Sequence, residues 1–252
     1  PGRVAGAREQ AVREVGVQMP AVFLAGFIPM LLVAFGYRAL NKVVPDAGTS
    51  FTWTVKAFGP YTGWMCGWGL ILATVIVLSN TAGVAATYLY LFLAALLDNP
   101  AIREFGDARL VNVITTSVFV AMATWVAYRG MMTAKRVTYV LVSFQMAMLL
   151  LFCALGLQKA LAGGVPSAIP FEWNWLNPFA IESAAALAAG LSLSIFIYWG
   201  WDVSLSANEE TSGSEHTPAL AALASIVMLA GTYLLVAIST QMFAGTGETG
   251  IG

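Results

Sequence analysis

Six long apolar runs constrain this chain more than any other feature of its 252 residues. A bilayer core is about 30 Å thick, so about 20 apolar residues in a helix suffice to cross it. Backbone surrounded by lipid must satisfy its own hydrogen bonds, as a helix does. We therefore expect an all-α integral membrane protein that crosses the cell membrane several times. The runs are residues 19–40, 61–97, 110–128, 138–161, 181–208 and 218–244.

The composition supports this fold class and argues against several kinds of function. Hydrophobic residues make up 59% of the chain and charged residues 10%, against about 25% charged in soluble domains. A formal net charge of −1, without a basic stripe, argues against a nucleic-acid partner. Cys66 and Cys153 lie inside apolar runs as packing residues, and His216 lies in a polar loop. We therefore expect no metal, no cofactor and no enzymatic activity.

The segments between the runs are predicted to be short helices or polar loops. Residues 49–58 are expected to form a short interfacial helix, and residues 209–217 a polar loop. Residues 1–18 are interpreted as a tail or the remnant of a preceding segment, and residues 19–252 as one transmembrane domain. Because the chain starts at Pro1 and ends directly after an apolar run, we expect it to be part of a longer protein.

The distribution of Lys and Arg predicts the orientation of the spans, because cytoplasmic loops carry an excess of both. We place residues 41–58, 129–136 and 209–217 in the cytoplasm, since more basic residues flank this set of loops than the opposite set. The N-terminal tail is set aside in this comparison, and its three arginines would offset the bias. The first set contains Arg38, Lys42, Lys56, Arg129, Lys135 and Arg136, and the second Arg103, Arg109 and Lys159.

The fifth run contains an aromatic-rich interruption that carries a glycine and an acid. Residues 182–209 would measure ~42 Å as one helix at ~1.5 Å per residue, so their midpoint lies near the membrane midplane. Gly200 and Asp202 follow this midpoint, and backbone that leaves a helix at such depth must be buried in protein or line a cavity. We predict a break between about Phe196 and Asp202, as in the substrate sites of secondary transporters. An ordinary span with an aromatic belt fits the segment equally well.

The second run carries two further features. Gly59, Gly63 and Gly67 repeat the small-residue spacing that lets another helix approach closely, so we expect a packing role for them. Ser79 and Asn80 belong to the most polar cluster inside any run. Asn80 is expected to face a partner helix or a wet cavity, because exposure to lipid would be costly.

Two sets of motifs connect these features to a known family. The first set is VPDAGTSF at residues 44–51 and AFGPYTGW at residues 57–64. The second is YWGWD at residues 198–202, NEE at residues 208–210 and TPAL at residues 217–220. The first set resembles the loop and third helix of amino acid permeases of the amino acid–polyamine–organocation (APC) superfamily. The second set resembles the sixth helix of those permeases and the loop that follows it.

The resemblance implies a secondary active transporter of amino acids or related amines that works by alternating access. It implies an inverted-repeat fold with a discontinuous helix, of which the six runs correspond to helices two through seven. Gly2, Gly6 and Gly16 do not reproduce the glycine-rich break of the family's first helix, so the chain alone is not expected to transport. Gln145 stands where some proton-coupled members carry a lysine, which leaves coupling to protons, to sodium or to exchange open.

The resemblance also implies a substrate site at the interrupted run. Phe196 stands where the family places an aromatic lid over the substrate, with plain packing as the alternative role. Asp202 could hold the unwound backbone or move a proton, and a helix cap is the alternative. The expected binding residues are Phe196, Ile197, Tyr198, Trp199, Gly200 and Asp202, with Ser79 and Asn80 from the second run. A channel and a membrane-embedded enzyme are the alternative functions, although neither a charged ring nor a catalytic cluster is seen.

Overall fold

The computed structural model describes residues 15–163, 165–181 and 183–246, so most of the predicted tail lies outside the described residues. Within the described part of the chain the regular structure is helical throughout. Six of these helices are long and apolar enough to cross a membrane. The prediction of an all-α membrane protein is confirmed.

The helices follow the predicted runs closely. The main helices are α2 (Met19–Val43), α3 (Ser50–Phe58), α4 (Pro60–Leu96), α5 (Ile102–Asp107), α6 (Arg109–Tyr128), α7 (Met131–Leu161), α8 (Ala184–Ile197) and α9 (Thr217–Ala244). Four 3-10 helices join them: η1 (Gly16–Gln18), η2 (Trp173–Leu176), η3 (Pro178–Ala180) and η4 (Trp201–Glu210). The short helix predicted at residues 49–58 is confirmed as α3, and its position at the membrane interface stays a prediction.

Two helix starts differ from the prediction by more than one residue, for physical reasons. Helix α7 begins at Met131 rather than at residue 138, because hydropathy detects the apolar part of a helix and not its polar first turns. Gly130, with φ of 97°, makes the turn that precedes it. Helix α8 begins at Ala184 rather than at residue 181, because the Ser183 side chain accepts a hydrogen bond from Ala186 N and so caps the helix.

The chain divides into two compact units. The first unit comprises Pro1–Trp53 and Ala147–Gly252, and the second comprises Thr54–Met146. The boundaries fall inside α3 and α7. The predicted division into a tail and one transmembrane domain stays a prediction.

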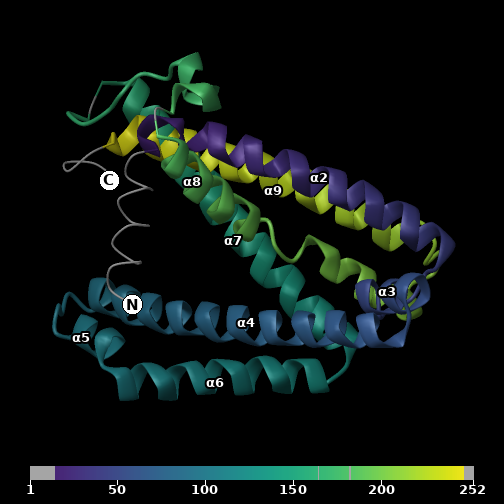
Figure 1. Ribbon diagram of the computed structural model, residues 1–252. Helices are drawn as coiled ribbons and strands as arrows, with labels where there is room; N and C mark the ends of the chain where they lie inside the picture. The colour runs from purple at the N-terminus through teal and green to yellow at the C-terminus, as the bar shows by residue number, and fades with distance from the viewer. Residues whose placement is uncertain (1–14, 164, 182, 247–252) are drawn as a thin grey trace. The chain divides into compact units, whose positions relative to one another are not determined.

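The second unit pairs α4 with α6 in antiparallel orientation, and α5 packs against α4 (Figure 1). Polar side chains join these helices. Asn112 of α6 donates to the Gly83 carbonyl at 3.3 Å and to the Gly106 carbonyl at 3.1 Å. Tyr90 of α4 and Thr115 of α6 share a hydrogen bond of 2.8 Å. Hydrogen bonds between helices stabilise association where lipid offers no partners.

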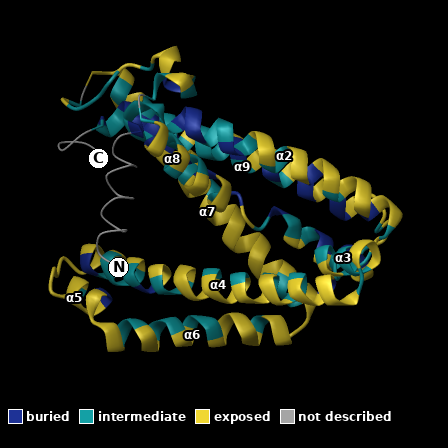
Figure 2. Cartoon of the chain, in the orientation of Figure 1, coloured by how far each residue is buried: buried dark blue, intermediate teal, exposed yellow. Residues whose placement is uncertain are grey.

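The predicted packing role is confirmed at Gly63 of α4. A Cβ added at Gly63 would collide with the Val55 side chain of α3 and would lie 3.0 Å from the Val55 Cα. Most of α4 and α6 is exposed or only partly buried (Figure 2), and the exposed residues include many large apolar ones. None of the residues in the most hydrophobic window of α6 is buried within the described structure. Such surfaces suit helices that face lipid or other membrane helices.

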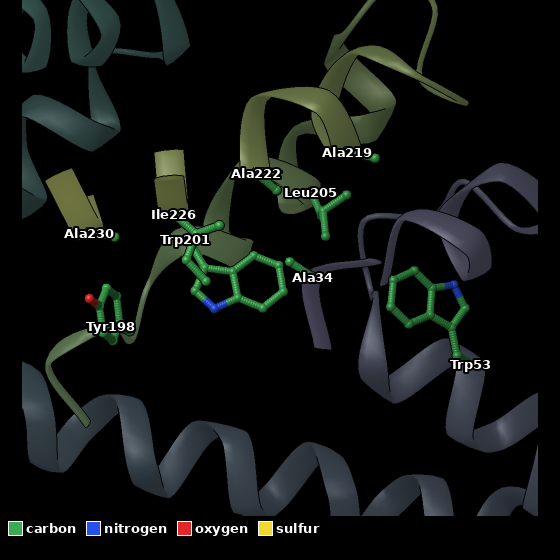
Figure 3. Packing of buried hydrophobic residues seen from close by; sticks show 9 residues of the cluster. All are labelled: Ala34, Trp53, Tyr198, Trp201, Leu205, Ala219, Ala222, Ile226 and Ala230. Carbon is green, nitrogen blue, oxygen red and sulfur yellow. The ribbon is translucent and has the colours of Figure 1, made fainter. Parts of the chain in front are cut away.

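In the first unit, α2 and α9 lie side by side in antiparallel orientation and α8 packs against α2 (Figure 1). A hydrophobic cluster fills the space among α2, η4 and α9. Trp201 and Leu205 of η4 gather beside Ala34 of α2 and Ala222 and Ile226 of α9 (Figure 3). Leu205 and Ile226 are fully buried, so the cluster holds η4 in place although η4 is not an α-helix.

Helices α2 and α8 approach closely because small residues face each other. A Cβ added at Gly26 of α2 would collide with the Ser194 Oγ and would lie 2.7 Å from the Ser194 Cβ of α8. One turn earlier on α8, a Cβ at Gly190 would lie 3.0 Å from a methyl group of Val22. Gly26 and Gly190 are therefore required for this distance between the two helices.

An amide pair joins the end of α2 to the end of η4. Asn208 donates to Asn41 Oδ1 at 2.6 Å and to the Asp46 carbonyl at 3.1 Å. Asn41 in turn donates to the Ser214 carbonyl at 2.8 Å. Asn41 and Asn208 are buried, and they lie 167 positions apart in the chain. The pair therefore ties three separate segments of the first unit together.

Asn208→Leu is expected to lower the stability of the protein by about 2 kcal/mol. The change removes two hydrogen bonds and leaves the buried Asn41 Oδ1 without its donor, at about 1–3 kcal/mol per buried unpaired group. The thermal midpoint of the purified protein measures the effect. Asn174→Leu, at an exposed position of the short 3-10 helix η2 with a hydrogen bond of 3.5 Å, is the control and should change the midpoint little. Equal shifts for both variants would contradict a stabilising role of the amide pair.

Candidate functional site

The fifth span is interrupted where the sequence predicts a break. Helix α8 ends at Ile197, a turn occupies residues 198–200, and η4 begins at Trp201. Gly200 has φ of 101° and ψ of −4°, a left-handed conformation that residues with a Cβ rarely adopt. The predicted break between about Phe196 and Asp202 is confirmed. The alternative of an ordinary continuous span is thereby excluded for this structure.

Two tyrosine hydroxyls connect the interruption to the neighbouring helices α9 and α2 by hydrogen bonds. Tyr233 of α9 donates to the Ile197 carbonyl at 2.9 Å. Tyr198, in the turn itself, donates to the Phe23 carbonyl of α2 at 3.2 Å. The two tyrosine rings lie 5.3 Å apart in a T-shaped arrangement, and Phe27 of α2 lies 6.0 Å from the Tyr198 ring. The turn is therefore anchored on both sides by oriented contacts.

The predicted binding residues near the break differ in how far their side chains are exposed. Tyr198 is fully buried and belongs to the hydrophobic cluster (Figure 3). Phe196 and Trp199 are each 46% exposed, and their rings lie 6.4 Å apart. Ile197 and Asp202 are partly buried. A Cβ at Gly200 would meet no atom within 4 Å, so the turn has open space beside it.

Ser79 and Asn80 lie on α4, in the second unit, and both are exposed. Their predicted part in substrate binding therefore stays a prediction. The expectation that Asn80 faces a partner helix or a wet cavity stays a prediction as well.

Sequence reasoning missed Tyr233, which is the residue that caps the end of α8. A signal for it was present. Tyr233 is a tyrosine in the middle of an apolar run, and a hydroxyl at membrane depth needs a hydrogen-bond partner. The sequence does not say which partner it meets, because Ile197 lies 36 positions away.

The chemistry available at the break is that of backbone dipoles. The carboxyl end of α8 and the amino end of η4 meet there, so partial negative and partial positive charge lie close together. Such a pair of helix ends can hold an ammonium group and a carboxylate without fixed charges. Within the described residues, no group of three or more His, Cys, Asp or Glu side chains could hold a metal ion.

Comparisons with known proteins agree with these features. The family model described as "Amino acid permease" matches residues 2–251. A methylthioribose transporter of Bacillus subtilis is 24% identical over 220 residues, which cover 86% of this chain and 45% of that protein. A branched-chain amino acid permease of Lactococcus lactis is 28% identical over 193 residues, covering 75% of this chain and 39% of that protein.

A more distant relative comes from an animal. Cationic amino acid transporter 4 of Mus musculus is 22% identical over 232 residues, covering 86% of this chain and 34% of that protein. The chain thus spans less than half the length of each of these relatives. No solved structure matches the chain.

Proposed function

The chain belongs to the amino acid permease family, and from this premise we propose that the protein carries amino acids or related amines across the cell membrane as a secondary active transporter. The chain spans less than half the length of the relatives it matches, so the proposal concerns the protein expressed from its complete gene. The names of those relatives describe transporters and permeases, and this favours a carrier over an enzyme.

The interrupted fifth span carries the proposal. Between Ile197 and Trp201 the chain offers two helix ends of opposite polarity. The length of the span predicts that they lie near the membrane midplane. An amino acid is a zwitterion, so its ammonium group and carboxylate match these two ends. Phe196 and Trp199, both half-exposed, are the side chains that we propose to cover the bound substrate.

The remaining predicted residues have supporting roles in this proposal. Ser79 and Asn80 of α4 would supply polar groups to the substrate path. Asp202 would hold the unwound backbone or move a proton. Some proton-coupled members of the family carry a lysine where this chain has the neutral Gln145 of α7, so coupling through a protonated lysine at this position is not part of the proposal. Flux measurements distinguish coupling to protons, coupling to sodium and exchange.

The names of the relatives set the range of solutes to be tested. They name methylthioribose, branched-chain amino acids and cationic amino acids. Uptake of labelled solutes of each class into proteoliposomes that contain the protein is the direct experiment. A carrier is expected to show saturable uptake and acceleration by substrate on the opposite side. Uptake that does not saturate would identify a channel, and chemical conversion of the solute an enzyme.

Phe196→Ala tests the lid. We expect the KM for uptake to rise roughly fivefold, because a lost aromatic contact is worth about 1 kcal/mol. The amount of folded protein should stay nearly normal, since Phe196 is half-exposed. Phe92→Ala is the matched control, because Phe92 is an exposed phenylalanine in the apolar span α4. An unchanged KM for Phe196→Ala, with normal protein levels, would refute the lid.

A further inference from the structure

We propose that Tyr198 and Tyr233 are positioning residues that fix the shape of the break in the fifth span, and that neither hydroxyl contacts the substrate. This inference rests on the proposed function for its consequence in transport. Its structural part concerns the described residues alone. It assigns Tyr198 a role different from the one that the sequence suggested.

The position of Tyr233 supports this role. The last carbonyls of a helix have no partner inside the helix and need one from elsewhere. At the end of α8, the Ile197 carbonyl receives its hydrogen bond from the Tyr233 hydroxyl at 2.9 Å. This hydrogen bond uses one of the two lone pairs of the carbonyl oxygen. Tyr233 thus fixes the end of α8 and leaves this carbonyl less free to accept a hydrogen bond from a substrate.

Tyr198 anchors the turn to a different helix. Its side chain is fully buried, and its hydroxyl donates to the Phe23 carbonyl of α2 at 3.2 Å. The ring lies between Phe27 of α2, at 6.0 Å, and Tyr233 of α9, at 5.3 Å. The Tyr198 side chain has no exposed surface and already donates its hydroxyl proton to α2, so it is not placed to contact a substrate directly. It can act on the substrate only through the backbone that it holds.

The two tyrosines therefore divide the segment into a holding side and an open side. The holding side consists of the Tyr198 side chain and the Ile197 carbonyl. The open side consists of Phe196 and Trp199, which are half-exposed, and Gly200, whose Cβ position is free. The substrate contacts that we proposed above are expected on the open side.

Removing each hydroxyl while keeping its ring tests the inference. The variants are Tyr198→Phe and Tyr233→Phe in the protein expressed from its complete gene. Tyr90→Phe is the matched control, because the Tyr90 hydroxyl shares a hydrogen bond of 2.8 Å with Thr115 in the second unit. Each of the three changes removes one tyrosine hydroxyl and keeps the aromatic ring in place. Tyr90 and Tyr233 lie in the spans α4 and α9, and Tyr198 lies in the turn after α8.

Hydrogen exchange of two backbone amides reports the shape of the break without any substrate. Trp199 N donates to the Phe196 carbonyl at 3.1 Å, and Val203 N donates to the Gly200 carbonyl at 3.3 Å. Loss of one bracing hydrogen bond should make these amides exchange about 2- to 10-fold faster in Tyr198→Phe and in Tyr233→Phe. Tyr90→Phe should leave both rates unchanged. Unchanged rates in both test variants would overturn the inference.

Uptake kinetics separate positioning from direct contact. A positioning role predicts that the KM rises in the same variants whose amides exchange faster. A raised KM for Tyr198→Phe without faster exchange would mean that the hydroxyl contacts the substrate, and it would overturn the inference. If the unmodified protein takes up none of the tested solutes, the proposed function fails. The exchange experiment then still decides whether the tyrosines hold the break.

Discussion

Gly200→Ala is expected to lower the rate of substrate uptake roughly 30-fold. The φ of 101° at Gly200 is a left-handed conformation that costs a residue with a Cβ about 1–2 kcal/mol. Alanine also favours a continuous helix by about 1 kcal/mol relative to glycine. A total of about 2 kcal/mol against the broken form corresponds to the 30-fold loss. The cost comes from the backbone alone, because a Cβ at Gly200 would meet no atom within 4 Å.

A matched control for this substitution exists in α9. Gly231 also has open space where a Cβ would lie, but it sits inside a regular helix. Gly231→Ala should therefore leave uptake unchanged and raise the thermal midpoint slightly. Uptake rates and protein levels of the two variants, measured side by side, check the prediction. Full activity of Gly200→Ala would show that transport does not depend on the left-handed turn.

Gly26→Ala is expected to destabilise the protein by about 1–3 kcal/mol, the usual cost of forcing an extra methyl group into a packed contact. The new Cβ would collide with the Ser194 Oγ and would lie 2.7 Å from the Ser194 Cβ. The Ser194 Cβ is attached directly to the α8 backbone, so rotating the side chain cannot relieve this contact. Helices α2 and α8 would have to move apart.

The same contact predicts a compensating change. Ser194→Gly removes both clashing atoms, so the double variant Gly26→Ala, Ser194→Gly should regain most of the lost stability. Gly36→Ala is the control on the same helix, because a Cβ at Gly36 would meet nothing within 4 Å. The thermal midpoints of the unmodified protein, the two single variants and the double variant form a double-mutant cycle. Additive effects of the two changes would contradict direct contact between the two positions.

The helices themselves could be predicted from the sequence because each depends on residues close together in the chain. Apolar runs of membrane length predict spans, and Gly200 with Asp202 at mid-membrane depth predicts the break. The same local reasoning placed the start of α7 too late. Lys135 and Arg136 interrupt the apolar pattern there without interrupting the helix. Hydropathy reports where a helix meets apolar surroundings, and helix formation can begin before that point.

The contacts between the helices could not be predicted in the same way. Asn41 and Asn208 are 167 positions apart, and Tyr198 and Phe23 are 175 positions apart. Which pairs meet depends on how the whole first unit packs. The sequence therefore suggested Tyr198 as a binding residue from its place in the motif, whereas the structure buries its side chain against α2 and α9. Exposure follows from tertiary packing, so the sequence alone could not show that Tyr198 is buried, and its part in binding stays a prediction.

The central claim is that the backbone at the break in the fifth span binds the substrate. An electron cryomicroscopy structure of the protein expressed from its complete gene, with a saturating amino acid that it transports, tests this claim most directly. We expect ligand density against the backbone between Phe196 and Asp202, with Phe196 or Trp199 over the ligand and the side chains of Tyr198 and Tyr233 behind the turn. Density at another site, or a fifth span that forms one continuous helix with substrate bound, would contradict it.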